Sequence, residues 1–571
     1  LLEILDHTHT AMGARLLRRW LERPLTDVNR IIQRQDGIKE LTGHTTELSQ
    51  LEEMLEHVFD FERILTRIEA NTTSPKDLLA LKASLGMIPE IKKLLSGTVS
   101  IVLRKLSDQM DIHSTVYELL DRSMNENGTG NIRDGKYIKE GYSAELDEVR
   151  SLSENSRKWI ADLEEREKEK TGIKLKIGFN NVFGYYFEIT NANKVPIPEY
   201  YMRKQTLVNA ERYITPELKE FETKALSAKE KTEELELKIY QAVKAAIRPE
   251  IAAMQRTAKA LAALDCLTGL SRAALKDRYV RPQITNSREG RISIHDGRHP
   301  MVEHALKREM FVPNDTELNH TDQEMIIITG PNMAGKSTYM RQVAVLTIMA
   351  QTGSFIPAKS ASFAPVDRIF TRVGAADDIS TGQSTFMVEM KEVSHILCNA
   401  TKNSLILLDE IGRGTSTYDG MSIARAVVEY LNANVHAYTL FATHYHELSD
   451  MAAENEHIKN YTVTVKERGK EITFLRRIVP GSADKSYGIH VARLAGLPES
   501  LLKRADEILE GLEVEGIKEE PAAPVIRRET ALNLFSSPII DELADLDVMS
   551  KTPIEAMEIL FRLSKEAKEG R

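Results

Sequence analysis

The chain has 571 residues, of which 42% are hydrophobic and 28% charged, and its formal net charge is −9. This length is too great for one hydrophobic core, so we expect roughly three or four domains of a soluble globular protein. The net charge argues against a globally basic nucleic-acid binder, but it leaves room for a local basic face.

Cysteine and hydropathy patterns exclude further classes of protein. Two cysteines rule out a disulfide framework and fit a reducing compartment. The apolar runs fall far short of the roughly 20 residues that a membrane helix needs. We therefore expect a cytoplasmic protein with no membrane partner. The opening "LLEILDHTHT" has neither a methionine nor a signal-peptide pattern, so the chain is expected to begin inside a longer parent protein.

The first part of the chain has the pattern of helices joined by short loops, as in "AMGARLLRRWLERP". A long, charged helix is predicted over residues 143–172, where a glycine stops it. A second long helix is predicted from the N-cap Thr215 to about Ile247. We expect a helical core domain over 1–142 and 216–285, from which the two long helices extend as levers.

The periodicity changes from 3.6 to 2 between these helices, at residues 173–215. Isoleucine, leucine and lysine alternate in "IKLKI", and "YYFEI" follows, so we predict a small β domain at the tip of the levers. Basic residues outnumber acidic ones here, and tyrosines lie among them. Such side chains suit DNA phosphates, although a solvated sheet face is the other interpretation. The predicted contacts to the DNA backbone are Lys174, Lys176, Arg203, Lys204 and Arg212.

A phosphate-binding loop is predicted at residues 330–338. "MIIITGPNMAGKSTYM" contains an apolar strand, the spacing Gly-x-x-x-x-Gly-Lys-Ser and the start of a helix, and a chance match is the alternative. Glycines let backbone N–H groups point at phosphates, Lys336 adds a positive charge, and the Ser337 hydroxyl suits Mg²⁺. The predicted nucleotide-binding residues are Gly330, Pro331, Asn332, Met333, Ala334, Gly335, Lys336, Ser337 and Thr338.

Two further apolar strands end on polar residues: "SLILLDE" ends on Asp409 and Glu410, and "YTLFA" is followed by Thr443 and His444. The carboxyl ends of parallel strands meet at one edge of a sheet, so these side chains should converge on Lys336. Asp409 is predicted to hold Mg²⁺, and Glu410 to activate the attacking water as a general base. His444 would sense the γ-phosphate or hold the water, or else be structural. The predicted catalytic residues are Lys336, Glu410 and His444.

A second turn that resembles an anion site lies in "ISTGQSTFMVEM", residues 379–390. Together with the strands above it completes the set of an ABC-type ATPase, in which such a turn faces the phosphate loop of a second subunit. Gly382, Ser384 and Thr385 are therefore predicted to bind the partner's ATP in trans, and the chain to form a homodimer. An ordinary capped helix would explain Ser384 alone.

Several stretches together resemble the MutS family of DNA mismatch repair ATPases. They are "LDHTHTAMGARLLRRWLERPL", "GFNNVFGYYFEIT", "MRKQTLVNAERYITPELKE", "TGPNMAGKSTYMRQ", "STFMVEM", "LLDEIGRGTSTYDG", "FATHYHEL" and "SYGIHVARLAGLP". The resemblance covers nearly the whole chain. It implies a helical core and lever domain with an inserted β clamp at 173–215, followed by an α/β ATPase domain at 286–512. It also implies ATP and Mg²⁺ as cofactors, double-stranded DNA as a partner, a MutL-type repair partner and a location at the bacterial nucleoid.

The resemblance assigns further residues by position. Phe311 lies where the family stacks the adenine, although a plain core role is the alternative, and Asp419 lies in the loop at the dimer interface. Residues 488–497 resemble the helix-turn-helix that completes the ATPase dimer, with a DNA-reading role as the alternative. A linker is expected at 513–530. Residues 531–571, which begin with a degraded clamp-binding peptide "ALNLF", would form C-terminal oligomerisation helices and contact a sliding clamp.

The chain departs from the family in two places. Ala334 stands where the family usually has glycine, a change that should not block phosphate binding. No phenylalanine is followed two residues later by glutamate, so the family's mismatch-reading Phe-x-Glu is missing from this sequence. We interpret the chain as a fragment of a mismatch-repair protein. The alternatives are a branch of the family without mismatch reading, which controls recombination, and a chromosome-maintenance ATPase with a coiled-coil insertion. A non-enzymatic DNA scaffold is a further class, but it would not need Lys336, Glu410 and His444 together.

Overall fold

The computed structural model describes residues 1–516, together with 559 and 562, apart from nine short internal ranges. These ranges are 129–131, 133–134, 181–183, 286–289, 307–309, 332–333, 374–383, 469–470 and 483–487. The chain forms two compact units, Leu1–Gly496 and Leu497–Arg571. Across the described part of the chain, no helix is both long enough and apolar enough to cross a lipid bilayer.

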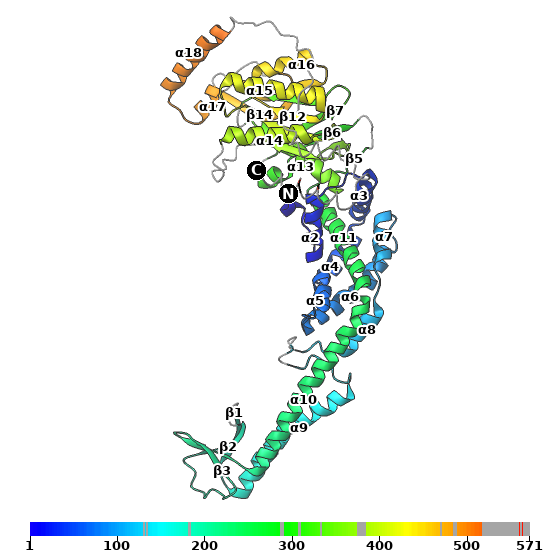
Figure 1. Ribbon diagram of the computed structural model, residues 1–571, viewed down its shortest axis with the longest axis vertical. Coiled ribbons are helices and arrows are strands. Elements are labelled where there is room, and N and C mark those ends of the chain that lie inside the picture. The colour runs from blue at the N-terminus through cyan, green and yellow to red at the C-terminus, as the bar shows by residue number, and fades with distance from the viewer. Residues whose placement is uncertain are drawn as a thin grey trace. The chain divides into compact units, whose positions relative to one another are not determined.

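Helix α11 (Ile251–Lys276) is the centre of a helical bundle in the larger unit (Figure 1). Its side chains are buried on nearly every face, because neighbouring helices pack around it. Buried Asp265 accepts hydrogen bonds from the His9 N–H (2.9 Å) and the Thr10 N–H (2.8 Å), which ties the N-terminal segment to this helix. The bundle contains α1 (Leu2–Leu5), α2 (Ala11–Glu22), α3 (Val28–Gly43), α4 (Thr45–Glu56), α5 (Phe61–Glu69), α6 (Pro75–Leu95), α7 (Ile101–Gln109) and α8 (Ser114–Ser123).

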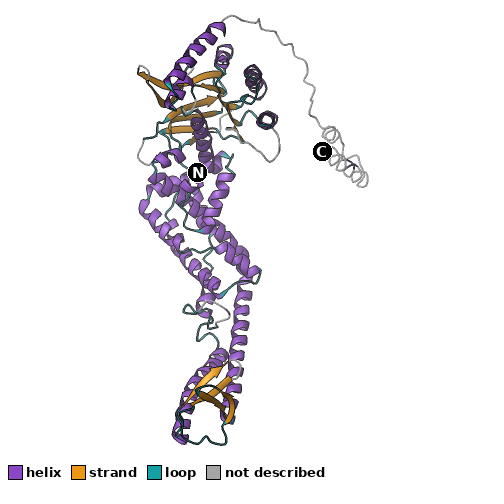
Figure 2. Ribbon diagram, turned by 90° about the vertical axis from the view of Figure 1, so that its left-hand side faces the viewer, coloured by secondary structure: helices purple, strands orange, loops and turns teal. Residues whose placement is uncertain are grey.

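The two predicted lever helices are present. Helix α9 (Ala144–Thr171) begins behind the capping hydroxyl of Ser143 and ends at Gly172, whose φ of 72° is left-handed. Helix α10 (Pro216–Ile247) begins behind the capping hydroxyl of Thr215. A one-turn helix, η2 (Arg248–Glu250), links α10 to α11. Because α10 runs through η2 into α11, this one of the two lever helices is continuous with the central helix of the bundle (Figure 2).

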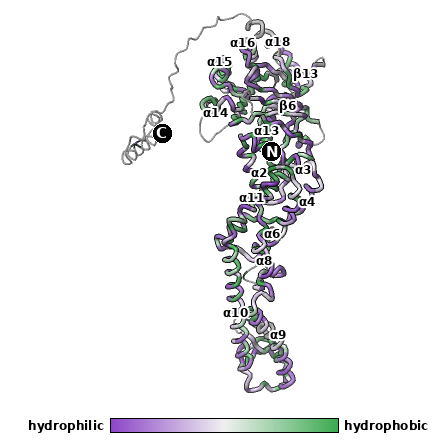
Figure 3. Tube along the Cα trace, turned by 90° about the vertical axis from the view of Figure 1, so that its right-hand side faces the viewer, coloured by the Kyte–Doolittle hydropathy of each residue, from purple (hydrophilic) through white to green (hydrophobic). Residues whose placement is uncertain are grey.

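A four-stranded antiparallel sheet joins α9 to α10. Its strands, in the order β1-β2-β4-β3, are β1 (Leu175–Asn180), β2 (Gly184–Thr190), β3 (Met202–Thr206) and β4 (Ala210–Ile214). One face packs Phe187 and Tyr213 against Leu163 of α9 and Leu218 of α10. Trp159 and Phe221 stack between the two helices, with ring centroids 4.0 Å apart. Figure 3 shows hydrophilic and hydrophobic segments alternating along α9 and α10, as expected for helices with one covered face.

A six-stranded sheet forms the core of the following α/β region, in the order β10-β11-β12-β8-β13-β14. Its first five strands pair in parallel and β14 pairs antiparallel to β13, so the ends of β8, β11 and β12 lie on one edge, as predicted. The strands are β8 (Met325–Thr329), β10 (Ile369–Arg372), β11 (Leu405–Asp409), β12 (Tyr438–Ala442), β13 (Ile458–Arg468) and β14 (Glu471–Pro480).

A second sheet of four strands, in the order β5-β9-β6-β7, adjoins this region. Its strands are β5 (Gln283–Ile284), β6 (Arg291–Gly297), β7 (Asn314–Asn319) and β9 (Ser360–Phe363). The helices of the region are α12 (Pro300–Leu306), α13 (Lys336–Thr352), α14 (Thr385–Asn399), α15 (Thr417–Tyr430), η4 (Leu431–Val435), η5 (His446–Asp450), α16 (Met451–Glu454) and α17 (Gly488–Leu494).

The smaller unit begins with α18 (Glu499–Gly516). This helix reaches residue 516, so the first four residues of the segment assigned to a linker, 513–516, are helical instead. Apart from residues 559 and 562, the predicted C-terminal helices and the "ALNLF" peptide lie outside the described residues.

Candidate active site

The loop between β8 and α13 has the geometry of a phosphate-binding loop. Gly330 and Gly335 have φ values of 133° and 104°, which a side chain would make costly. Ala334 is buried and is not among the residues with positive φ, so its methyl group causes no backbone strain in the loop. Asn332 and Met333 lie outside the described residues.

Lys336 is the first residue of α13 and is only 4% exposed. Its ammonium group donates to the carbonyl oxygens of Gly330 and Pro331, the latter at 3.2 Å, so it folds back over its own loop. Burial lowers the pKa of Lys336 to about 8, although Glu410 and Asp409 act in the opposite direction. The lysine charge is therefore poorly solvated, and a bound phosphate would stabilise it.

Asp409 and Ser337 meet at the predicted metal position. The Ser337 hydroxyl donates to the Asp409 carboxylate, yet burial raises the pKa of that carboxyl, and the nearby Glu410 charge raises it further. Asp409 Oδ1 is buried and has no hydrogen-bond partner among the described residues. A hydroxyl beside a buried carboxylate oxygen that lacks a partner is a donor set that fits Mg²⁺, which prefers oxygen ligands.

Glu410 and His444 also meet, across the ends of β11 and β12. His444 Nε2 lies 2.6 Å from Glu410 Oε1, and the Arg413 guanidinium pairs with Glu410 Oε2. Burial acts to raise the pKa of Glu410, but the His444 hydrogen bond and the Arg413 charge outweigh it, so the pKa lies below its ordinary value. In this arrangement Glu410 is an ionised carboxylate with a cationic neighbour.

The backbone at Glu410 is unusual. Its φ is 59°, in the left-handed region that a non-glycine residue rarely adopts, and its N–H donates to the Ala442 carbonyl at 2.9 Å. Such strain persists only where surrounding structure holds it, and it is concentrated at functional sites. The turn directs the Glu410 side chain away from the line of the strand and toward His444.

The Ser384 turn begins α14, and both Ser384 and Thr385 are exposed. The Ser384 hydroxyl accepts a hydrogen bond from the Met387 N–H at 3.3 Å, so it also caps its own helix. Gly382 lies outside the described residues. Whether this turn serves a second subunit stays a prediction, as does the role of Asp419, whose carboxylate accepts a 2.7 Å hydrogen bond from the Ser416 hydroxyl at the start of α15.

Three residues of this site were missed from the sequence. Arg413 pairs with Glu410, although no spacing rule singles it out. Glu389, buried in α14, accepts a 2.6 Å hydrogen bond from the Gly412 N–H, and Tyr445 donates to the Gly412 carbonyl at 3.2 Å. The available signal for Glu389 in the sequence was a single glutamate among the apolar residues of "STFMVEM". Together these bonds fix the loop that follows Glu410 to the helix that Ser384 begins.

Thr338 and Phe311 were predicted to contact the nucleotide, and both are half-buried. Thr338 follows Ser337 in the first turn of α13, whereas Phe311 lies in the segment before β7. No contact among the described residues assigns Phe311 to the phosphate loop, and the adenine-stacking role stays a prediction.

The predicted DNA contacts lie on the four-stranded sheet, apart from Lys174, which immediately precedes β1. Lys174, Lys176 and Lys204 are exposed, and exposed Arg203 pairs with Glu211 at 3.2 Å. Arg212 is different. Its guanidinium pairs with Glu188 (3.1 Å), donates to Gln205 (2.9 Å) and lies 4.2 Å from the Tyr186 ring centroid, so much of its charge is already engaged within the sheet.

Comparisons with known proteins agree with this architecture. The family model "MutS domain III" matches residues 1–271, and "MutS domain V" matches residues 326–513. The DNA mismatch repair protein MutS of Caldicellulosiruptor bescii is 49% identical over 99% of this chain and 67% of its own length. Those of Syntrophomonas wolfei and Acetivibrio thermocellus are 50% and 47% identical, over 99% and 100% of this chain and 65% and 66% of their own lengths. The chain thus spans about two thirds of the length of these relatives.

Proposed function

The chain belongs to the MutS family of DNA mismatch repair proteins, and from that premise we propose that it is a DNA-dependent ATPase that acts as a dimer around duplex DNA. The observation that carries the proposal is the convergence of three groups at one edge of a parallel sheet. They are the phosphate loop, the Ser337–Asp409 pair and the Glu410–His444 pair.

The phosphate loop would bind ATP. Its backbone N–H groups and the N-terminus of α13 favour negative charge, and the Lys336 ammonium would exchange its carbonyl partners for phosphate oxygens. Ser337 and Asp409 would hold Mg²⁺, which supplies charge neutralisation at the phosphates when it is bound. Mg²⁺ would also give a ligand to the buried Asp409 Oδ1, which has no hydrogen-bond partner among the described residues, and this favours the arrangement.

Glu410 would act as the general base. It takes a proton from the water whose oxygen bonds to the γ-phosphorus as the bond to ADP breaks, and the products are ADP and phosphate. Because His444 and Arg413 hold its pKa low, Glu410 is a weak base in the present arrangement. We infer that one of these partners moves aside when nucleotide binds, which would raise the basicity of Glu410 only in the loaded site.

Ser384 and Thr385 would complete the ATP site of a second subunit. Their exposure at the N-terminus of α14 supports the proposal, because a bound phosphate could reach both hydroxyls. The Glu389–Gly412 hydrogen bond then gives each subunit a direct connection between the turn that it offers to its partner and the loop beside its own Glu410.

DNA would contact the sheet at the tip of the levers, where Lys174, Lys176 and Lys204 are exposed. Binding to chromosomal DNA would place the protein at the bacterial nucleoid. A MutL-type partner, contact with a sliding clamp, and oligomerisation through residues 531–571 follow from family membership alone.

The two alternative functions have less support. A chromosome-maintenance ATPase carries its coiled coil after the phosphate loop, whereas α9 and α10 precede it here. The similar proteins named above are all mismatch repair proteins, which favours that role over control of recombination. Phosphate release from ATP, measured with and without duplex DNA, tests the proposal. We expect hydrolysis that depends on Mg²⁺ and changes with DNA, and a chain without ATPase activity would contradict it.

ADP affinity should depend on pH through Lys336. The pKa of about 8 means that Lys336 loses its proton as the pH rises through 8, and a phosphate favours the protonated form. Affinity should therefore fall by about tenfold between pH 7 and pH 9, with proton uptake on binding above pH 8. Calorimetry in two buffers of different ionisation enthalpy measures this uptake. Since the Glu410 charge raises the pKa of Lys336, Glu410→Gln should move the transition to lower pH.

DNA affinity should fall with rising salt, because phosphate contacts release counterions. The double variant Lys174→Gln/Lys176→Gln should weaken binding to all sequences equally and flatten the log–log salt slope by roughly 2 if both lysines contact phosphates. Lys105→Gln, an exposed lysine of α7, is the control for loss of charge. Arg212 is unsuitable for this test, because its replacement also breaks the Glu188 pair. An unchanged slope in the double variant would remove this face from the proposed DNA interface.

A further inference from the structure

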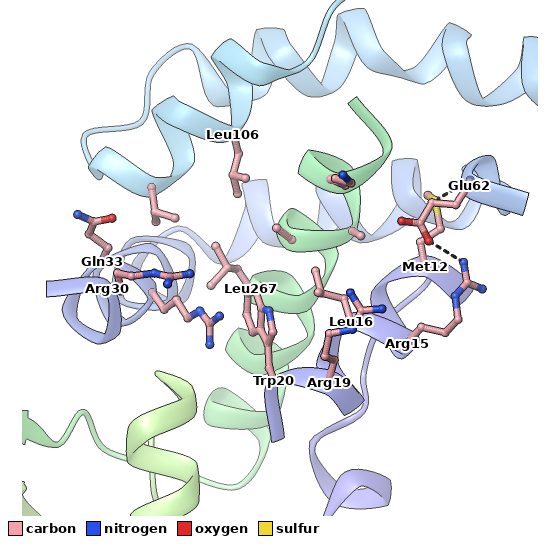
Figure 4. Close-up of a pocket in the computed structure, with 15 residues that line it drawn as sticks. Met12, Arg15, Leu16, Arg19, Trp20, Arg30, Gln33, Glu62, Leu106 and Leu267 are labelled. Atoms are coloured by element: carbon pink, nitrogen blue, oxygen red, sulfur yellow. Dashed lines mark hydrogen bonds and ion pairs between the residues drawn. The ribbon is translucent and has the colours of Figure 1, made fainter. Parts of the chain in front are cut away.

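A cavity of about 400 Å³ lies in the helical bundle, among α2, α3, α7 and α11. Its apolar lining includes Leu106, Leu267 and the indole of Trp20. Figure 4 shows Trp20 beneath Leu267, with Arg30 on one side and Arg19 on the other. The volume lies in the range typical of small-molecule sites. None of its lining residues belongs to the predicted ATP or DNA sites.

The charge of the lining is strongly positive. One basic residue, Arg15, is neutralised by Asp60 at 2.7 Å and Glu62 at 3.0 Å. For the other basic side chains of the lining, no carboxylate lies within ion-pair distance in the described part of the chain. These unpaired residues are Arg19, Arg30, Arg34 and Lys259. Four unpaired cations around one small cavity repel one another, so an anion within it would be favoured.

Arg34 is the least exposed of these four and is held in place. Its guanidinium lies 3.5 Å from the Trp20 ring centroid and donates to the Thr352 carbonyl at 2.8 Å. Burial lowers the pKa of Arg34 to about 9, which shows how poorly solvated its charge is. A half-buried cation that has no carboxylate beside it is costly, and a ligand anion would remove that cost. The fixed guanidinium also offers its remaining N–H groups without further ordering.

Arg34 also connects the cavity to the helix that follows the phosphate loop, through its hydrogen bond to Thr352. Thr352 is the last residue of α13, the helix that Lys336 begins. Next to it, Gln351 exchanges two hydrogen bonds with Leu25, whose N–H donates to the Gln351 carbonyl at 3.0 Å and whose carbonyl accepts from Nε2 at 2.9 Å. One end of α13 therefore lies at the predicted ATP site and the other is attached to the wall of the cavity.

We propose that this cavity binds a small polyphosphate-bearing molecule of nucleotide size, and that its occupancy changes the affinity of the phosphate loop through α13. A phosphate chain carries several negative charges and matches four cations better than a single carboxylate does. The guanidinium groups can bind its oxygens in pairs, and the apolar lining residues can contact the rest of the ligand. The coupling rests on the proposed ATPase function, whereas the binding site does not.

Tryptophan fluorescence can report binding in the full chain. The sequence has two tryptophans, Trp20 and Trp159, so Trp159→Phe leaves the indole of the cavity as the reporter. Inorganic tripolyphosphate is titrated at fixed free Mg²⁺ and without nucleotide, because ADP itself belongs to the class of ligand proposed for the cavity. We expect a saturable change in Trp20 emission. The triple variant Arg19→Gln/Arg30→Gln/Lys259→Gln, which changes exposed rim residues, should weaken this binding by at least about tenfold.

The matched control is Arg18→Gln. Arg18 lies on α2 beside Arg19, is exposed, and pairs with Glu22 at 3.0 Å instead of lining the cavity. The affinity of the Arg18→Gln variant for tripolyphosphate should equal that of the parent. No saturable change, or an equal loss in the control, would overturn the site. A duplex oligonucleotide that saturates the same signal and is lost with the same triple variant would assign the cavity to DNA and overturn the small-ligand proposal.

The coupling is tested by ADP affinity with and without saturating tripolyphosphate. Linkage requires each ligand to change the affinity of the other by the same factor, and we expect about threefold or more. This change should disappear in the triple variant and persist in Arg18→Gln. Binding in the cavity with unchanged ADP affinity would overturn the coupling. Failure of ADP to bind at all, with tripolyphosphate binding intact, would instead contradict the proposed ATPase function.

Discussion

Glu410→Gln should slow ATP hydrolysis by about 10²–10⁴-fold while ATP binding is retained. The amide keeps the size and the polarity of the side chain but cannot accept the proton of the attacking water. It also ends the pairing with Arg413 and removes a negative charge from the neighbourhood of the phosphates. At a pH low enough to keep Lys336 protonated, ATP binding should therefore be unchanged or tighter, and the variant should accumulate as an ATP-bound dimer.

Lys336→Ala should fail at the earlier step. The ammonium group is buried and would be one of the charges that contact phosphate, and a charge-assisted hydrogen bond contributes about 1.5–3 kcal/mol. ATP affinity should thus fall by roughly 10- to 100-fold. The turnover rate at saturating ATP is measured separately from this affinity.

Equilibrium binding and single-turnover hydrolysis, measured on both variants, separate the two roles. Arg18→Gln serves again as a control for the loss of a surface charge. Equal loss of ATP affinity in the two variants would mean that Glu410 does not act on the water.

Mixing Ser384→Ala with Lys336→Ala should restore activity that neither variant has alone. If Ser384 completes the partner's site, a mixed dimer has one site with both defects and one site with neither. The intact site should give up to about half of the parent activity in confirmed mixed dimers, because half of the sites are intact. ATPase activity of co-purified dimers with different tags is the measurement, and Ser227→Ala, at an exposed serine of α10, is the control.

Ser384 also caps α14, so a loss of activity on its own would not prove a role in trans. An N-cap contributes typically about 1 kcal/mol. Ser384→Asp separates the two roles, because aspartate retains the cap but places a negative charge against the partner's phosphate. Recovery of activity in Ser384→Asp would reduce Ser384 to a helix cap, and no recovery in the mixed Ser384→Ala dimers would likewise contradict the in-trans site.

The sequence by itself predicted those features that depend on neighbouring residues. Ser143 and Gly172 marked the ends of α9, and Thr215 marked the start of α10, because capping and left-handed termini are set within a few residues. The alternation in "IKLKI" likewise predicted β1 and its covered face. Parallel pairing of strands that end on Asp409 and His444 followed from general rules of α/β sheets.

Only the tertiary structure decided what each charged side chain contacts. Arg212 was predicted as a contact to the DNA backbone, and the structure adds that Glu188 and Gln205, on the two neighbouring strands, engage its guanidinium. Helix α18 ends at Gly516, four residues inside the segment 513–530 that was predicted as a linker, since local propensity marks boundaries poorly.

In the active site and in the cavity, too, the contacts join residues that are far apart in the sequence. Residues 34 positions apart, Glu410 and His444, form one hydrogen bond, and Arg413 shares the same carboxylate. Arg34 reaches Thr352 across 318 positions. Sequence patterns give the type of each residue and the element it lies on. The distance between two elements depends on packing of the whole chain, so partner choice, pKa direction and the basic cavity arise only in the folded structure.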